Sequence, residues 1–231
     1  MVTHAHIREK VFRSGGRGLR PRIVVLGGGG HARVILDILA QAEEFEVMGF
    51  TSRDAEQQTT ALSGYPRLGT DEALPELFSS GIRHAFVAVG DNKRRKRCFG
   101  ELTSMGFTMV NVISRHAVIS PRASLGLGVG IMPGAVINIG TVIGDGAIVN
   151  TNASVDHDCT IGAFAHIAPG TALAGNVKVG SGALLGVGSR VIPGVTIGAN
   201  STVAAGAVVI HDLPPDLFAA GVPARAKTPS L

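Results

Sequence analysis

An Asp-His-Asp triplet at residues 156–158 is the strongest candidate for chemistry in this chain. A carboxylate bonded to one imidazole nitrogen orients the ring and raises its basicity, which leaves the other nitrogen to accept a proton near neutral pH. His157 therefore qualifies as a general base, with Asp158 as its partner. The alternative interpretations are an exposed turn histidine at 157 and a surface histidine at a corner for His166, nine residues later.

Zinc binding by these two histidines is the less favoured interpretation. A zinc site needs three or four ligands on one side of the ion. His157 and His166 are expected on different faces of neighbouring repeats, and His116 and His211 lie far along the repeats from both. We therefore expect no metal.

The triplet lies in a six-residue repeat that runs from Ile113 to Val209 without an insertion. A fixed short period with turn residues in every step is the signature of a solenoid, and six residues suit one short strand and one turn. The repeat thus predicts a parallel β-helix. A second inward residue, mostly small, follows four positions after each aliphatic one, which predicts Cys159 as a buried thiol. The aliphatic positions are Ile113, Ile119, Leu125, Ile131, Ile137, Ile143, Val149, Val155, Ile161, Ile167, Leu173, Val179, Leu185, Val191, Ile197, Val203 and Val209.

The residues before the repeats alternate between strand-like and helix-like patterns, which predicts a small parallel α/β sheet with ligands at the carboxyl ends of its strands. A strand at 22–26 leads through GGGGHA into a helix from residue 33, and a second strand covers 46–50. A helix is expected from Asp71, a strand at 84–90 and a helix at 91–106, and TMVNVI at 108–113 leads into the repeats.

The glycine turn predicts a phosphate site. Gly27, Gly29 and Ala32 loosely match GxGxxA between a strand and a helix, where backbone N–H groups can approach a phosphate. A nucleotide or nucleotide sugar is favoured over NAD, because this domain is short and Thr51-Ser52-Arg53 replaces the acidic residue that a ribose would need. A tight packing turn without a ligand is the alternative.

Composition favours a soluble two-domain protein. The chain is 45% hydrophobic and 16% charged over 231 residues, and no apolar run is long enough for a bilayer. No secretory signal is visible, so we expect the cytoplasm.

The positive charge is concentrated at the N-terminus. Residues 1–22 carry a formal charge of +5, whereas the whole chain carries +4, so the rest of the chain has a charge of −1 and no basic surface that would indicate a nucleic acid partner. That segment is interpreted as a flexible extension, with a nucleic-acid-binding arm as the less favoured alternative. Cys98 and Cys159 form no disulfide framework.

The repeats, SVDHDCTIGAFAHIAPG at 154–170, LAGNVKVG and the closing GVPARAK resemble the hexapeptide-repeat acyltransferases. GGGGHA and AVGDN narrow the resemblance to the NeuD/PglD-type sugar acetyltransferases, over residues 22–227. It implies a Rossmann-like nucleotide-sugar-binding domain at 22–112, a left-handed β-helix at 113–214 and a tail at 215–231, after the extension at 1–21. It also implies a homotrimer with active sites between neighbouring solenoids.

The resemblance assigns His157 as the base and Asp158 as the residue that raises its basicity. It implies that acetyl-CoA contacts His166, Gly175, Val187 and Ala205, and that the nucleotide sugar contacts Gly29, Gly30, His31 and Gly90. UDP-sugar-binding relatives usually carry an acidic pair where this chain has Thr51-Ser52, so UDP, GDP and dTDP all stay open.

The expected function is direct acetyl transfer from acetyl-CoA to the amine of a nucleotide-linked 4-amino-4,6-dideoxy sugar in glycan or lipopolysaccharide synthesis. The first alternative is O-acetylation of a sugar such as sialic acid. A γ-carbonic-anhydrase-like metalloenzyme and a non-catalytic scaffold are the others.

Overall fold

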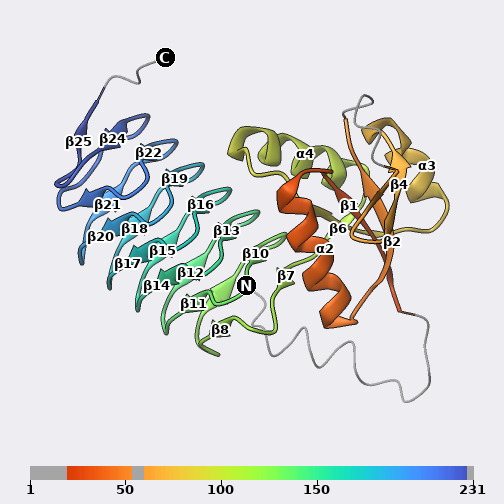
Figure 1. Cartoon of the computed structure of the whole chain (residues 1–231), viewed down its shortest axis with the longest axis horizontal. Helices are drawn as coiled ribbons and strands as arrows, with labels where there is room; N and C mark the ends of the chain where they lie inside the picture. The colour runs from red at the N-terminus through yellow and green to blue at the C-terminus, as the bar shows by residue number, and fades with distance from the viewer. Residues whose placement is uncertain (1–19, 54–59, 228–231) are drawn as a thin grey trace.

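The computed structural model describes residues 20–53 and 60–227. The predicted extension, except for its last two residues, lies outside the described residues. Figure 1 shows an α/β domain beside a stack of coils whose first turns, near β7 and β8, adjoin that domain. None of the helices in the described ranges is both long and apolar enough to cross a membrane.

The α/β domain holds a six-stranded sheet in the order β3-β4-β2-β1-β5-β6, parallel except for the β3–β4 pair. This confirms the predicted small parallel sheet. Its elements are β1 (Arg22–Leu26), α2 (Gly30–Ala42), β2 (Glu46–Thr51), β3 (Ala61–Leu62), β4 (Tyr65–Gly69), the 3-10 turn η1 (Asp71–Ala73), α3 (Leu74–Ser79), β5 (His84–Val87), α4 (Asn92–Ser104) and β6 (Thr108–Met109).

Two details differ from the sequence-based expectation. The hairpin of β3 and β4 was not expected, because its strands are short and contain Pro66 and Gly69 in place of a regular apolar alternation. The helix expected from Asp71 begins as a 3-10 turn, and the α-helix starts only at Leu74. Pro75 stands in the first turn of α3, where its missing N–H costs no hydrogen bond.

The second part of the chain is a three-sided parallel β-helix. Each coil pairs with the next at an offset of one full turn, as Ile137 does with Val155. The predicted aliphatic residue is the second residue of each strand, so the repeat and its phase are confirmed. The strands are β7 (Val112–Ile113), β8 (Val118–Ile119), β9 (Ser124–Leu125), β10 (Gly130–Ile131), β11 (Val136–Ile137), β12 (Val142–Ile143), β13 (Ile148–Val149), β14 (Ser154–Val155), β15 (Thr160–Ile161), β16 (His166–Ile167), β17 (Ala172–Leu173), β18 (Lys178–Val179), β19 (Leu184–Leu185), β20 (Arg190–Val191), β21 (Thr196–Ile197), β22 (Thr202–Val203) and β23 (Val208–Val209).

The strands form three faces. The first face contains β7, β10, β13, β16, β19 and β22, and continues into β24 (Phe218–Ala220) and β25 (Arg225–Ala226). The second face contains β8, β11, β14, β17, β20 and β23, and the third contains β9, β12, β15, β18 and β21. The pairing of β24 with β22 places part of the expected tail within the first face.

The interior of the β-helix follows the predicted pattern. The aliphatic residues and the small residues between them form one buried cluster, and Cys159 belongs to it with no exposed surface. The α/β domain covers the start of the first face, because Val112, Met132 and Ile148 share a cluster with Ile35 and Phe86. The two parts of the molecule are thus joined by a common apolar core.

Candidate functional site

His157 stands in the turn between β14 and β15, at the corner where the second face meets the third. The next residue, Asp158, has a φ of 59°, in the left-handed region. One coil earlier the same position is Gly140, where a Cβ would come within 2.3 Å of the Asp158 carboxylate. A glycine at 140 therefore leaves room for the Asp158 side chain at this corner.

The histidine is paired as predicted from the triplet. Nδ1 of His157 lies 2.9 Å from Oδ2 of Asp158. Asp156 accepts from the His157 backbone N–H at 2.8 Å and from Nδ2 of Asn138 at 2.8 Å, so it holds the turn and leaves the ring to Asp158. The hydrogen bond from Asp158 is the largest cause of a raised pKa of His157, and the charge of Asp156 adds to it. The His157 side chain is 49% exposed, which leaves the ring accessible to a substrate.

Gly175 lies one coil beyond His157 and faces the free side of the ring. A Cβ at Gly175 would come within 2.4 Å of Nε2 of His157, so only glycine admits the imidazole in this orientation. The Gly175 N–H donates no hydrogen bond within the described residues. The structure thus brings the predicted base and the predicted thioester-contacting backbone together.

The glycine turn after β1 is tight at its start and open at its end. A Cβ at Gly27 or Gly28 would collide with the Ala88 carbonyl or with Ser52, so both are required for packing. A Cβ at Gly29 or Gly30 would meet nothing within 4 Å. Gly29 precedes α2 as its N-cap without a side-chain cap, so no cap side chain occupies the N–H groups of the first turn.

His31 and His166 come together at the junction of the two domains. His31 lies in the first turn of α2 with a buried Nε2 that has no hydrogen-bond partner among the described residues, and His166 begins β16 on the first face. Burial lowers the pKa of each histidine to about 4. The charge of Arg95 is the next cause of the lowering in both, and His31 lowers the pKa of His166 further. Both rings are therefore neutral near pH 7. The Gly90 backbone acts in the opposite direction and raises the pKa of His166, which brings Gly90 into the same group.

Val187 and Ala205 lie elsewhere. They occupy successive turns at the corner between the first and second faces, and the Gly206 N–H donates to the Val187 carbonyl at 2.8 Å. His157 and Gly175 lie at the opposite edge of the second face. A single chain therefore does not gather the predicted base and all predicted acetyl-CoA contacts, because His166, the Val187 corner and the His157 corner are on different sides.

Arg95 is a site residue that sequence reasoning missed. Its side chain is 1% exposed, and it donates to carbonyls of the β5 exit and of the solenoid: Val89, Gly90, Gly146, Phe164 and Ala165. Burial lowers its pKa to about 10, so it stays protonated at neutral pH. The only signal in the sequence was the basic run 93–97, in which nothing separates a buried arginine from solvated neighbours.

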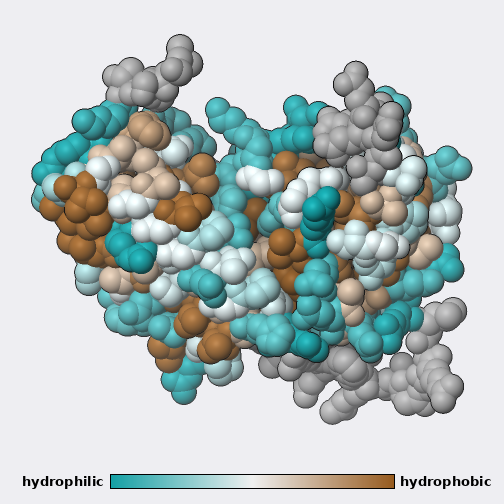
Figure 2. Space-filling model, in the orientation of Figure 1, coloured by the Kyte–Doolittle hydropathy of each residue, from teal (hydrophilic) through white to brown (hydrophobic). Residues whose placement is uncertain are grey.

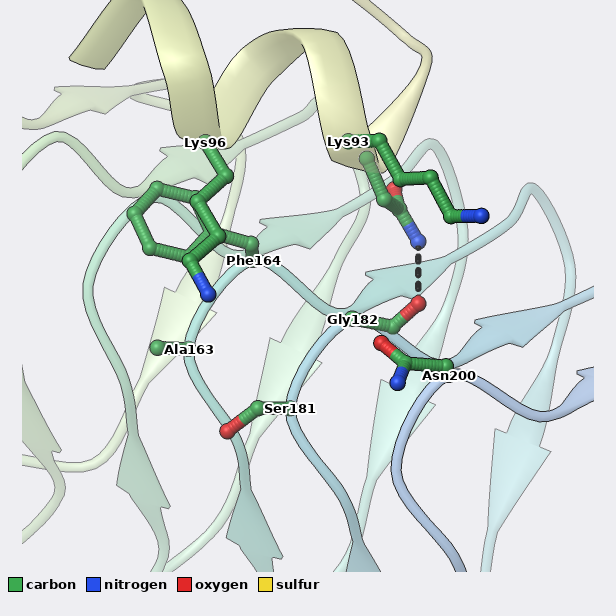
Figure 3. A pocket seen from close by; sticks show the side chains of 8 residues that line it. Lys93, Lys96, Ala163, Phe164, Ser181, Gly182 and Asn200 are labelled. Atoms are coloured by element: carbon green, nitrogen blue, oxygen red, sulfur yellow. Dashed lines mark hydrogen bonds between the residues drawn. The ribbon is translucent and has the colours of Figure 1, made fainter. Parts of the chain in front are cut away.

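The N-terminus of α4 also contacts the solenoid at the corner between the third and first faces. Nδ2 of Asn92 donates to the carbonyl of Gly182 at 2.9 Å (Figure 3) and to that of Ala183 at 3.1 Å. These bonds and those of Arg95 fix the α/β domain against three successive coils. A shallow groove remains beside them, lined by Asn92, Lys93, Lys96, Ala163, Phe164, Ser181, Gly182 and Asn200.

The other chemically capable groups of the solenoid are placed for packing. Sγ of Cys159 donates to the Ala174 carbonyl at 3.2 Å, and burial raises its pKa. A thiol in that state is a poor nucleophile. In the described ranges, no three histidine, cysteine or acidic side chains lie close enough together to hold a metal ion.

Comparison with known families matches both parts of the chain. Residues 22–102 match the PglD N-terminal domain, and residues 176–211 match the bacterial transferase hexapeptide repeats. Among solved structures, PerB from Caulobacter crescentus in complex with CoA and GDP-perosamine is 47% identical, with a TM-score of 0.86 over 92% of this chain and 99% of that chain. Another structure of perosamine N-acetyltransferase from this organism has a histidine replaced by asparagine and contains the same two ligands.

The acetyltransferase domain of PglB from Neisseria gonorrhoeae, in complex with acetyl coenzyme A, is 35% identical, with a TM-score of 0.85 over 91% of this chain and 100% of that domain. These likenesses extend over both domains and the junction between them. The chain therefore belongs to the PglD-type sugar acetyltransferases of the hexapeptide-repeat superfamily, and is an acyltransferase with a Rossmann-like domain followed by a left-handed β-helix.

Proposed function

We propose that this enzyme transfers the acetyl group of acetyl-CoA to the amine of a GDP-linked 4-amino-4,6-dideoxy sugar, GDP-perosamine or a close analogue. The observation that carries the proposal is the His157–Asp158 pair with Gly175 against the ring, in a chain 47% identical to PerB, which binds CoA and GDP-perosamine. We place the reaction in the cytoplasm, on a route to an acetylated glycan.

The base is Nε2 of His157. Its partner Asp158 bonds to Nδ1, so Nε2 is the nitrogen left to accept a proton from the attacking amine. The amine nitrogen forms a bond to the thioester carbonyl carbon, the carbon–sulfur bond breaks, and the proton held on His157 passes to the departing CoA sulfur. We assign stabilisation of the oxyanion to the Gly175 N–H, which donates no hydrogen bond to any described residue. Direct transfer is consistent with Cys159, whose thiol is buried and has a raised pKa.

The nucleotide sugar is assigned to the crevice at the carboxyl ends of β1 and β5. The open turn at Gly29 and Gly30 offers N–H groups to a diphosphate. His31 and Gly90 lie at the same end of the sheet, and the buried, partnerless Nε2 of His31 is a group that a sugar can satisfy. His166 joins them from the solenoid, at the point where the sugar would leave the α/β domain.

A homotrimer is the assembly we propose for the complete site. The two edges of the second face carry the base and the Val187–Ala205 corner, so a threefold arrangement around this face lets one edge meet the opposite edge of a neighbour. Side chains at these edges are apolar and uncovered in the single chain: Ile139 is 45%, Ile192 40% and Val187 56% exposed. Apolar patches also interrupt the polar surface of the solenoid half in Figure 2.

The test is release of CoA with GDP-, UDP- and dTDP-linked 4-amino sugars, with sialic acid as a hydroxyl acceptor. We expect turnover of the GDP-linked amine and a loss of about 10²- to 10⁴-fold in His157→Ala, because general-base catalysis is removed. The half-exposed ring makes no core contact, so circular dichroism and oligomeric state should not change. Turnover of sialic acid alone, or an active His157→Ala enzyme, would contradict the proposal.

A further inference from the structure

Three side chains, those of Thr51, Arg53 and Asp71, gather where β2 and β4 end, away from the base and the solenoid. Oγ1 of Thr51 donates to Oδ1 of Asp71 at 3.1 Å, and Nε of Arg53 donates to Oδ2 at 3.0 Å. The Ser52 N–H donates to the Gly69 carbonyl at 3.1 Å, which ties the two strand ends together. The result is a carboxylate with one buried hydroxyl partner and one exposed cationic partner.

This cluster lies directly beside the glycine turn that follows β1. The Gly27 N–H donates to the Thr51 carbonyl at 2.8 Å, and Gly28 packs against the Ser52 side chain. β1, β2 and β4 are neighbours in the sheet, so Asp71, just after β4, is two strand spacings from the turn after β1. Two spacings are about 10 Å, which is the reach of a ribose and a base beyond a diphosphate.

We propose that Asp71 and Arg53 read the base of the nucleotide and select guanine, an assignment that rests on the proposed function. The Asp71 carboxylate accepts from guanine N1–H and the exocyclic N2–H, while the outer nitrogens of Arg53 donate to O6. The carboxylate has room for these bonds, because two oxygens offer about four acceptor positions and the described residues occupy only two of them.

The exposures of Asp71 and Arg53 suit the proposed reading of the base. The Asp71 side chain is 17% exposed and Arg53 45% exposed, so the carboxylate is held in place while the guanidinium can move onto a ligand. Within the described residues, Arg53 uses only its Nε in a hydrogen bond. Thr51 has no exposed surface, and its hydroxyl fixes the orientation of the Asp71 carboxylate from the buried side.

The Asp71–Arg53 pair also disfavours pyrimidine bases. Uracil and thymine present one N–H between two carbonyl oxygens, so one of those oxygens would face a carboxylate oxygen without a proton between them. Specificity then comes from an unfavourable contact as well as from a lost one. Hypoxanthine keeps N1–H and O6 but has no N2 amine, so it isolates the second bond to Asp71.

The experiment is calorimetric titration of the full chain with GDP, IDP and UDP, without acetyl-CoA. We expect GDP to bind roughly ten- to a hundredfold more tightly than IDP or UDP, as one lost base contact predicts. In Asp71→Asn, GDP affinity should fall by a similar factor while IDP changes much less, so the preference for GDP over IDP collapses. Glu72→Gln, which removes a neighbouring exposed charge, is the matched control and should keep the preference.

Equal binding of GDP, IDP and UDP by the unmodified chain would overturn the proposal, and needs no variant that has to fold. A GDP preference retained in Asp71→Asn would also overturn it. The binding data are independent of acetyl transfer: absence of turnover with intact GDP selectivity would contradict the proposed function alone, and turnover with unselective binding would contradict the base assignment alone.

Discussion

At the scale of single residues, basicity at an exposed corner comes from the neighbours of the imidazole. His157 is half exposed, so burial lowers its pKa less than the Asp158 hydrogen bond raises it. His31 and His166 show the opposite balance, because burial and the Arg95 charge lower the pKa of each to about 4. This difference suits the proposed site, in which His157 accepts the proton while the neutral rings of His31 and His166 bind the sugar.

Replacing Asp158 by asparagine tests this balance. A general base must be neutral, so the acid limb of the kcat/KM profile follows the raised pKa of His157. Loss of the carboxylate should move that limb to lower pH, toward 6.5, and reduce kcat roughly tenfold because the base is weaker. Asp145→Asn, a distant solenoid carboxylate that accepts from Leu127, is the control. An acid limb that stays in place, or moves to higher pH, would contradict the assigned pairing.

At the scale of elements, Arg95 joins α4 to the solenoid. Its guanidinium donates to the Val89 carbonyl just after β5 and to the Phe164 carbonyl in the solenoid, and no carboxylate accepts from it among the described residues. The charge is therefore stabilised by oriented backbone dipoles, and the carbonyls in turn depend on it. This contact therefore helps to set the position of the glycine turn after β1 relative to β16.

Arg95→Met keeps the bulk of the side chain and removes every donor. We expect it to destabilise the fold by about 3 kcal/mol, since several buried carbonyls lose their partner. For a chain of this size that shifts Tm down by about 6–12 °C, measured by differential scanning calorimetry. Arg97→Met removes an exposed helical ion pair instead, and should shift Tm by about 1 °C. Equal shifts in the two variants would rule out Arg95 as the contact that joins the domains.

At the scale of the whole molecule, the β-helix places the base and the Val187–Ala205 corner at opposite edges of one face. Coils of fixed length cannot bring these edges together within one chain. The shared site that we propose therefore takes its facing edge from a second copy of the chain.

Mixed trimers test that geometry. His157→Ala removes the base, and Ala205→Trp fills the exposed corner assigned to acetyl-CoA, so each variant alone should be inactive. If each site takes its base from one subunit and its groove from the next, random mixing leaves about a quarter of all sites intact, and about a third of the sites in the mixed trimers alone. Co-expression with two affinity tags, followed by a CoA-release assay, measures the recovery. No recovery in purified mixed trimers would contradict a shared site.

The sequence by itself determined what is periodic or local. The hexads predict every coil, the phase predicts Cys159 in the core, and adjacency alone pairs His157 with Asp158. The strand, glycine turn and helix from 22 to 42 are local as well. These features depend on neighbours within a few residues, or on a repeat that stacks each coil in only one register.

Only the tertiary structure decided which distant segments meet. Asp71 reaches Arg53 through a hairpin with weak strand signals, and Arg95 is buried although its sequence is a run of cations. His166 faces His31 instead of the Val187 corner, because the α/β domain covers the first face. These contacts arise from packing between segments far apart in the chain, where residue type and spacing carry no information about which surfaces touch.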